Sequence, residues 1–156
     1  MPRLVLFQPE IPPNTGNVAR SCAATHTELH LIEPLGFEIS DRTLKRAGLD
    51  YWPWVDLHRH GSWEQFREQQ CQRGGRLLAL SRHAELPYHR VSYRPDDWLL
   101  FGRESSGLPG AVLADADLAL TIPMPGSISS GGGVRSLNLA TAAGVVLFEA
   151  LRQLQG

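Results

Sequence analysis

The sequence is poor in lysine, in cysteine and in long apolar runs. Lys45 is the only lysine among 15 basic residues, and Cys22 and Cys71 are the only cysteines. Two cysteines without metal-ligand spacing give little support to a disulfide framework or a zinc site, so we expect reduced thiols. No apolar run is long enough to cross a bilayer, and no basic-then-apolar leader opens the sequence. We therefore expect a cytoplasmic protein without a membrane partner.

A charge excess of either sign is also missing. The formal net charge is −1 and the pI is near 6.6, which gives no global signature of a nucleic-acid binder. All basic residues except Lys45 are arginine, whose fork suits phosphate, but a compositional bias is the plainer explanation. With 156 residues and 42% hydrophobic content, we expect one domain, 1–156, without a separate RNA-binding extension.

Strand-like and helix-like segments alternate along the chain. Short apolar, β-branched or leucine-rich runs predict strands, and Asn14, Ser40 or Asp41, and Ser62 stand where helices would begin. This alternation predicts an α/β fold with a mainly parallel sheet and helices on both faces, and with its site at the carboxyl ends of the strands. The predicted strands are Arg3 to Phe7, Leu29 to Glu33, Trp54 to His58, Arg76 to Leu80, Trp98 to Gly102 and Leu118 to Ile122.

The last predicted helix, Ser136 to Gln153, is apolar over more of its circumference than one buried stripe requires. Small residues between Ala140 and Gly144 would let another helix approach closely. We expect a homodimer interface through this C-terminal helix; the alternative is a core helix packed wholly within its own chain.

A glycine-rich stretch, GSISSGGGVRSLNLA at 126–140, precedes that helix. Glycines before a helix suggest a phosphate loop. However, Val134, Arg135 and Ser136 stand where a nucleotide-triphosphate loop needs lysine and Ser/Thr, and Ser136 takes the place of the third glycine of a dinucleotide fingerprint. The stretch therefore predicts neither kind of nucleotide site.

Three ordered motifs are more specific than this loop. They are PEIPPNTGNVARSC near the N-terminus, FGRESSGLPG at 101–110, and IPM at 122–124 followed later by RSLNLA at 135–140. Asn14 and Arg20 lie six positions apart in the first motif, so they reach one site only if the loop turns Asn14 inward. In the second motif a strand end runs into a glycine, two charged residues and a new helix start.

With these motifs the chain resembles the SPOUT superfamily of knotted RNA methyltransferases, and within it the small TrmL-like tRNA 2′-O-methyltransferases that act at the wobble nucleotide. The resemblance covers nearly the whole chain, through LIEPLGF, RAGLDY and LLALS as well as the three motifs. It implies a deep trefoil knot in the C-terminal third, an exception to unknotted connectivity. It also implies S-adenosylmethionine as methyl donor, the tRNA anticodon stem-loop as substrate and a homodimer. We expect neither a metal nor DNA as a partner.

The resemblance also assigns residues. It places the donor at Leu80, Gly102, Ile122 and Ser136, with Met124 and Leu137 lining its pocket, and gives catalytic positions to Asn14, Arg20, Glu104 and Asn138. Glycine at 102 would leave the backbone open to the ligand. The connection from Gly126 to Gly133 is longer than the family's, and we expect it to bend around the donor. Arg20 is expected to act across a dimer interface.

Methyl transfer to a ribose 2′-hydroxyl needs alignment and an outlet for the proton. Because a guanidinium is a poor proton acceptor, we expect Arg20 to clamp a substrate phosphate, while a phosphate oxygen, Glu104 or water takes the proton. Plainer alternatives remain: Asn14 and Ser136 as helix caps, and Glu104 as a surface partner of Arg103. Asn138, one turn into an apolar helix, would need a polar partner if buried.

Two further groups of residues give weaker indications of function. Arg42, Lys45 and Arg46, beside Tyr51, Trp52 and Trp54, suggest an RNA-facing patch or, equally, a solvated helix face. We expect His58 and His60 to face opposite sides of a strand and to make a poor metal pair, and we assign no metal. Two other functions stay open: a non-catalytic knotted RNA-binding or ribosome-assembly factor, and ribose methylation at another RNA site.

Overall fold

The computed structural model of the protein describes residues 1–40, 52–126, 134 and 136–155. Seven parallel strands form one sheet in the order β3-β2-β1-β6-β4-β7-β5. The strands are β1 (Arg3–Phe7), β2 (Leu29–Ile32), β3 (Leu57–His60), β4 (Leu77–Leu80), β5 (Leu86–Pro87), β6 (Trp98–Phe101) and β7 (Leu118–Thr121).

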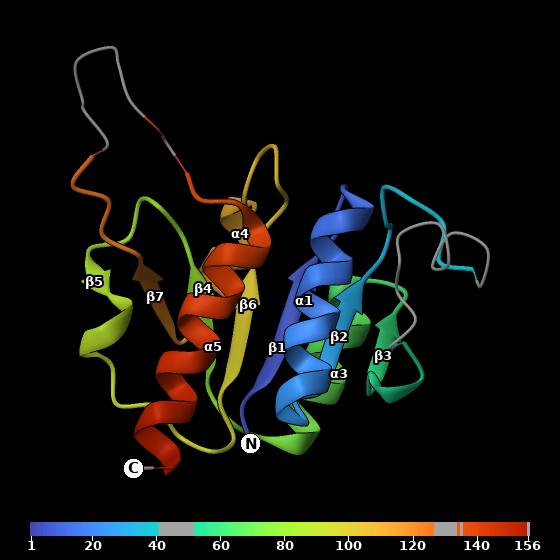
Figure 1. The fold of residues 1–156 in the computed structure, drawn as a ribbon, viewed down its shortest axis with the longest axis horizontal. Helices are drawn as coiled ribbons and strands as arrows, with labels where there is room; N and C mark the ends of the chain where they lie inside the picture. The colour runs from blue at the N-terminus through green and yellow to red at the C-terminus, as the bar shows by residue number, and fades with distance from the viewer. Residues whose placement is uncertain (41–51, 127–133, 135, 156) are drawn as a thin grey trace.

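Helices cover both faces of this sheet (Figure 1). The α-helices are α1 (Pro12–Thr25), α3 (Trp63–Arg73), α4 (Gly110–Ala114) and α5 (Leu139–Gln155), and the short 3₁₀ turns are η1 (Trp52–Trp54) and η2 (Tyr88–Arg90). In Figure 1, α1 and α5 lie side by side on the near face and α3 lies behind the sheet. The predicted parallel α/β architecture with helices on both faces is therefore confirmed.

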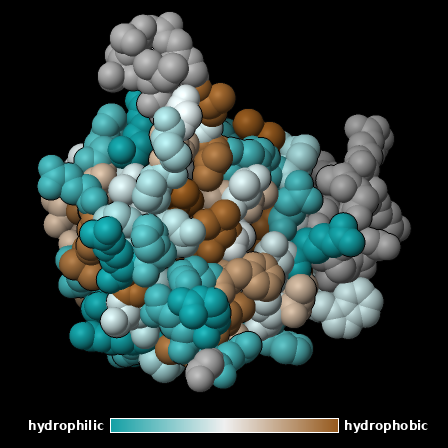
Figure 2. All heavy atoms as spheres, turned by 60° about the vertical axis from the view of Figure 1, so that its left-hand side comes forward, coloured by the Kyte–Doolittle hydropathy of each residue, from teal (hydrophilic) through white to brown (hydrophobic). Residues whose placement is uncertain are grey.

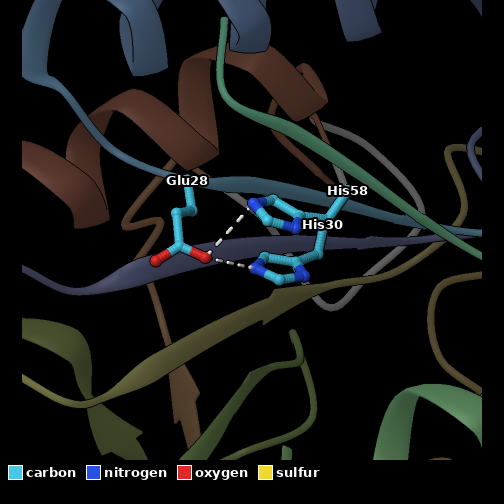
Figure 3. A group of neighbouring side chains, drawn as sticks. All are labelled: Glu28, His30 and His58. Atoms are coloured by element: carbon cyan, nitrogen blue, oxygen red, sulfur yellow. Dashed lines mark hydrogen bonds and ion pairs between the residues drawn. The ribbon is translucent and has the colours of Figure 1, made fainter. Parts of the chain in front are cut away.

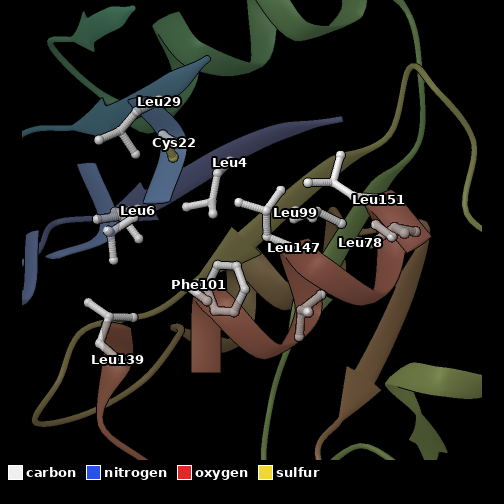
Figure 4. Packing of buried hydrophobic residues seen from close by; sticks show 14 of the residues in the cluster. Leu4, Leu6, Cys22, Leu29, Leu78, Leu99, Phe101, Leu139, Leu147 and Leu151 are labelled. Atoms are coloured by element: carbon white, nitrogen blue, oxygen red, sulfur yellow. The ribbon is translucent and has the colours of Figure 1, made fainter. Parts of the chain in front are cut away.

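Strand alternation divides the buried side chains into two cores. Leu4 and Leu6 of β1 point toward α1 and α5, where Cys22, Leu99 and Leu147 join them (Figure 4). Val5 and Phe7 of the same strand point the other way, into a core with α3 and α4. A strand that is apolar on both faces is what a covered parallel sheet requires.

Several boundaries differ from the sequence expectations. The third strand is Leu57–His60 rather than Trp54 to His58, because WPW forms the turn η1. Proline favours the first turn of a helix, so α1 begins at Pro12, inside which Asn14 lies. The prediction that Asn14 begins this helix as its cap is therefore wrong.

At the other helix starts the outcomes differ. Ser62 is the cap of α3, with its hydroxyl accepting from the Gln65 amide at 3.1 Å, as predicted. The final helix begins at Leu139, later than the expected Ser136. The helix expected after Ser40 or Asp41 lies outside the described residues. Strand β5 has only two residues and carries no pattern that the sequence could reveal.

The two cysteines form no disulfide, as expected; Cys22 is buried and Cys71 is exposed. Across the residues that the structure describes, no helix has both the length and the apolar character needed to span a membrane.

Candidate active site

The carboxyl ends of four strands surround a cavity of about 480 Å³. The chain builds β1, β2 and β3 outward in one direction and then crosses over to β4, while β6 later fills the position between β1 and β4. Ligands bind at such points in parallel sheets, because neighbouring loops diverge there. Segments after β1, β4, β6 and β7, together with the start of α5, form the cavity wall.

The cavity collects residues from all three sequence motifs. Each expected site residue except Arg20 lines it: Asn14, Leu80, Gly102, Glu104, Ile122, Met124, Ser136, Leu137 and Asn138. The wall thus combines apolar side chains with a few polar groups, which is the usual composition of a small-molecule site. Arg20 lies on an exposed turn of α1 and is not in the wall of this cavity.

Gly102 allows the loop after β6 to fold back on itself. A Cβ at Gly102 would lie 2.3 Å from the carbonyl carbon of Gly107 and 2.5 Å from the Leu108 nitrogen. Arg103 and Gly107 pair their backbones across this loop, and Gly107 has a φ of 67°, in the left-handed region that favours glycine. The need for glycine at 102 therefore comes first from the loop itself rather than from an approaching ligand.

Glu104 holds the entry into α1. Its carboxylate accepts hydrogen bonds from the Glu10 amide at 3.0 Å and the Ile11 amide at 2.7 Å, and a longer one from Asn14 Nδ2 at 3.4 Å. The Ile11 amide belongs to the N-cap residue of α1, and the Glu10 amide directly precedes it; a negative charge is favourable at such a helix start. The alternative that Glu104 is only a surface partner of Arg103 is wrong, since Arg103 instead donates to Gln8 Oε1.

A chain of side-chain hydrogen bonds runs from Glu104 to α5. Asn14 donates to Glu104, and Asn14 Oδ1 accepts from Asn138 Nδ2 at 2.9 Å. Asn138 Oδ1 in turn accepts from the backbone amides of Ala140 and Thr141 at 2.9 and 3.2 Å. Asn138 is therefore the cap of α5, the role that the sequence offered to Ser136. The expectation that Asn138 lies one turn into this helix is wrong, because it precedes Leu139 and is exposed.

Some cavity residues were not anticipated. Ser81, Arg82 and His83 follow β4 directly and line the wall, as does Thr121 at the end of β7. Their position just after predicted strands could have indicated a role in the site, but they belong to none of the three motifs and the resemblance assigns them no role. Of the expected RNA-facing patch, Trp54 is 72% exposed and Trp52 packs against the larger core. Arg42, Lys45, Arg46 and Tyr51 lie outside the described residues, as does the stretch from 127 to 133.

A second polar cluster lies at the amino ends of β2 and β3 (Figure 3). His30 is stacked between His58 and His60, with ring centroids 4.5 and 5.1 Å away. The expectation that His58 and His60 face opposite sides is wrong, because residues two apart in a strand share a face. His30 Nδ1 lies 2.8 Å from His60 Nε2, and His30 Nε2 lies 3.1 Å from Glu28 Oε1.

Glu28, His30 and His58 bring three potential metal ligands within 4.8 Å of one another. Glu28, however, already binds Arg73 through both oxygens, at 2.7 and 2.8 Å. The stacked imidazoles of His30 and His58 are only 13° from parallel, so their nitrogen lone pairs do not converge on one point. Among the described residues, Glu28 thus already pairs with Arg73, His30 and His58.

This network has shifted pKa values. The Arg73 guanidinium lowers the pKa of Glu28 to about 2. Burial, with His58 as a further cause, lowers the pKa of His30 to about 3 and also lowers that of His60. His30 is therefore neutral at physiological pH and able to connect Glu28 to His60 by hydrogen bonds.

Comparison with known proteins identifies the architecture. The family model described as "SpoU rRNA Methylase family" matches residues 1–148. The chain belongs to this family. Among its SpoU-family relatives, a Synechocystis protein provisionally named tRNA (cytidine(34)-2′-O)-methyltransferase is 54% identical over 99% of this chain and 98% of its own length. A Beijerinckia indica tRNA (cytidine(34)-2′-O)-methyltransferase is 49% identical over 96% and 90% of the two chains.

Solved structures agree with this assignment to the SpoU family. A structure described under "Structural insights into the 2-OH methylation of C/U34 on tRNA" superimposes with a TM-score of 0.90 at 54% identity, covering 100% of this chain and 97% of the other. An AdoMet-bound rRNA methyltransferase from Sinorhizobium meliloti has a TM-score of 0.81 at 25% identity, covering 98% and 56%.

Proposed function

We propose that the protein methylates the ribose 2′-hydroxyl of the wobble nucleotide, cytidine or modified uridine 34, in tRNA, with S-adenosylmethionine as donor. The main support for this proposal is the cavity at the carboxyl ends of the strands, where residues from three separated motifs meet. Relatives that align over nearly their whole length carry this activity in their names. We further propose that the protein works in the cytoplasm.

The cavity fits such a donor in size and composition. Its volume lies within the range of small-molecule sites, and Leu80, Ile122, Met124 and Leu137 supply apolar surface for a nucleoside. We propose that these residues, with Gly102 and Ser136, hold the donor. When bound, the donor supplies an electrophilic methyl group on a sulfonium.

On this proposal the protein contributes mainly alignment. The residues around the cavity would hold the ribose 2′-hydroxyl in line with the methyl group that the donor would supply, and the hydroxyl proton would need an acceptor. Glu104 already accepts three N–H groups, so it fits an orienting role better than that of proton acceptor. We therefore route the proton to a substrate phosphate oxygen or water, with Asn14 and Asn138 fixing the acceptor side of the cavity.

Arg20 enters this proposal from a second subunit. It lies on the exposed side of α1, outside the cavity wall of its own chain. Exposed apolar side chains near α5 include Leu137 at 38% and Phe148 at 52%, and Figure 2 shows apolar patches interrupting the polar surface on one face of the molecule. Gly144 on α5 has open space where a Cβ would lie. We propose that α5 forms a homodimer interface that brings Arg20 to the partner's cavity.

The remaining fold proposal is the trefoil knot. The placement of β6 between β1 and β4, and of α5 beside α1, is compatible with a C-terminal segment threaded through a loop. Family membership supports it.

The function is tested by incubating the protein with S-adenosylmethionine and unmodified tRNA, followed by mass spectrometry of nuclease fragments that cover position 34. A new ribose methyl at that position is expected. Donor binding without methylation of any tRNA would contradict the substrate, and failure to bind the donor would contradict the enzymatic function.

The cross-subunit role of Arg20 has its own test. Arg20→Ala and Glu104→Gln proteins, each impaired alone, are mixed after dissociation and reassembly. A mixed dimer should regain one complete site, because the intact Arg20 and the intact cavity then come from different chains. No gain over the separate proteins would contradict a shared site.

A further inference from the structure

Two loops meet beside the cavity where β1 and β6 end. These strands pair in parallel, with Leu6 opposite Phe101, so the segment after β1 and the loop after β6 leave the same edge of the sheet. The first segment, residues 8–11, leads into α1, and the second, residues 103–107, carries Glu104.

A carboxylate from each loop accepts hydrogen bonds from the other loop. Glu104 accepts from the backbone amides of Glu10 and Ile11, as described above. In return, Glu10 Oε1 accepts from the Ser105 amide at 3.0 Å and from the Ser105 hydroxyl at 2.7 Å. Each loop thus presents a carboxylate to the backbone of the other. We call these four residues, Glu10, Ile11, Glu104 and Ser105, the reciprocal clamp.

Neighbouring contacts fix the first loop from other directions. Arg103 donates to the Gln8 side chain, and Gln8 itself has a φ of 46°, which is uncommon for a residue other than glycine. On the opposite side, the Gly36 amide donates to the Pro9 carbonyl at 2.9 Å. A Cβ at Gly36 would lie 2.8 Å from Glu10 Cα, so the backbone at Glu10 has little freedom to move.

From this arrangement we infer that Glu10 is a positioning residue for methyl transfer. Glu10 holds the loop that carries Glu104, Glu104 holds Asn14, and Asn14 reaches the cavity beside Asn138. The inference rests on the proposed function. Glu10 itself is not in the cavity wall, so it would act through the loop that carries Glu104 rather than by touching a ligand.

The contribution of Glu10 to folding is expected to be small. Its hydrogen bonds with Ser105 are exposed to solvent, where water replaces a lost partner, so Glu10→Ala should leave the melting temperature close to that of the wild type. Its effect on geometry is expected to be larger, because a displacement of about 1 Å in an alignment-dependent reaction costs up to roughly 100-fold in rate. A positioning role and a stabilising role therefore predict different measurements.

The principal test compares Glu10→Ala with the wild type in wobble methylation at 25 °C, well below the melting temperature. We expect kcat to fall by about 10- to 100-fold, with unchanged donor affinity by titration calorimetry. Glu10→Gln, which keeps one acceptor oxygen, should recover part of the loss. Glu68→Ala on α3 is the matched control, since it removes an exposed carboxylate from the other face of the sheet.

Two further variants test whether Glu10 acts through the clamp. Ser105→Ala removes one of the donors to Glu10, and its effect should not multiply with that of Glu10→Ala, because both break the same contact. Gly36→Ala pushes on the Glu10 backbone from the opposite side and should lower kcat while leaving the Glu10 side chain in place. Amide hydrogen exchange at residues 103–107 should rise in Glu10→Ala.

Different results would contradict the role of Glu10 and the proposed function. An active wild type beside a Glu10→Ala protein of normal kcat would overturn the positioning role alone. Multiplicative effects of Glu10→Ala and Ser105→Ala would equally overturn it, since independent residues behave in that way. A wild type that binds the donor but methylates no tRNA would overturn the proposed function, and with it the role of Glu10 in turnover.

Discussion

Polar side chains cluster both at the amino ends of the parallel strands, here called the amino edge of the sheet, and at their carboxyl ends, the carboxyl edge. The two clusters differ in what their polar groups bind. At the amino edge, Glu28 binds His30 and Arg73, and His30 continues the network to His60 at the end of β3. The buried Asp97 carboxylate accepts from Nε and Nη2 of Arg76 at 2.9 and 2.8 Å. At the carboxyl edge, Glu104 and Asn14 bind backbone amides and neighbouring amide side chains, and they line an open cavity.

This difference shows where chemistry is possible. The amino-edge groups Glu28 and His30 are paired with neighbouring side chains, and the rings of Trp98 and Phe66 pack edge-on against His30. The carboxyl-edge groups are held from behind by amides, so their positions are fixed while their other side faces the cavity. We therefore expect substitutions at the amino edge to change stability and those at the carboxyl edge to change turnover.

The largest effect is expected from Asp97→Ala. Asp97 is fully buried, and its removal leaves the Arg94 amide without its acceptor and the Arg76 guanidinium with only the Ser92 carbonyl. Breaking a buried pair in this way costs about 3–5 kcal/mol. Chemical denaturation should show this loss, whereas kcat of the remaining folded protein should not change. A stable variant with lost turnover would contradict the division between the edges.

Arg20→Ala should have the largest effect on the reaction itself. If Arg20 stabilises developing charge near the 2′-oxygen, kcat should fall on the order of 100- to 1,000-fold. Donor affinity and the melting temperature should stay close to those of the wild type. Arg67→Ala on α3 removes an arginine from the other face and serves as control. Normal turnover by Arg20→Ala would remove this residue from the mechanism.

Gly102→Ala tests how closely the carboxyl-edge loop is packed. The new methyl group would meet the Gly107 and Leu108 backbone, and overpacking of this kind costs about 1–3 kcal/mol. Because the loop must shift, donor affinity should fall together with stability. Gly110→Ala, where the added carbon meets open space, is the matched control. Equal behaviour of the two variants would contradict the close approach at Gly102.

The smallest effect near neutrality is expected from pH. The pKa of His30 is lowered to about 3 and that of His60 is lowered as well. Below about pH 6.5 these histidines therefore bind protons in the unfolded chain more readily than in the folded chain. The free energy of unfolding should therefore be highest above about pH 6.5 and fall as pH decreases toward 3, by up to about 1.4 kcal/mol per pH unit from His30, and His60 should add to the loss in the same direction. The lowered pKa of Glu28 acts in the same direction between about 4.5 and 2.

Denaturation midpoints measured between pH 8 and pH 4 check this prediction. The slope should be smaller in His30→Asn, which has no titrating ring. An unchanged slope in that variant would place the pH dependence elsewhere in the protein.

The sheet could be predicted from the sequence because buried parallel strands are apolar on both faces, as in RLVLF and WLLF. The site could be assembled only through the resemblance, since nothing in the spacing of Asn14, Glu104 and Asn138 reveals that they touch. Helix starts were harder to predict: Asn14 has the chemistry of a cap, yet Pro12 begins the helix and Glu104 supplies the acceptor from a distant loop.

The histidine cluster was missed for a similar reason. His58 and His60 could be read along one strand, but their partner His30 lies on β2, and register between strands is not visible in a local pattern. Glu10 likewise reads as part of a polar approach to a helix, and its contact with Ser105 joins positions 95 residues apart.

The most direct test of the account measures methylation of tRNA position 34 by three proteins in parallel: wild type, Asn14→Ala and His30→Asn. A ribose methyl at that position is expected from the wild type and from folded His30→Asn at similar rates, and Asn14→Ala should methylate at a strongly reduced rate with intact donor binding. Normal methylation by Asn14→Ala, or its loss in a well-folded His30→Asn, would contradict the placement of the reaction at the carboxyl edge.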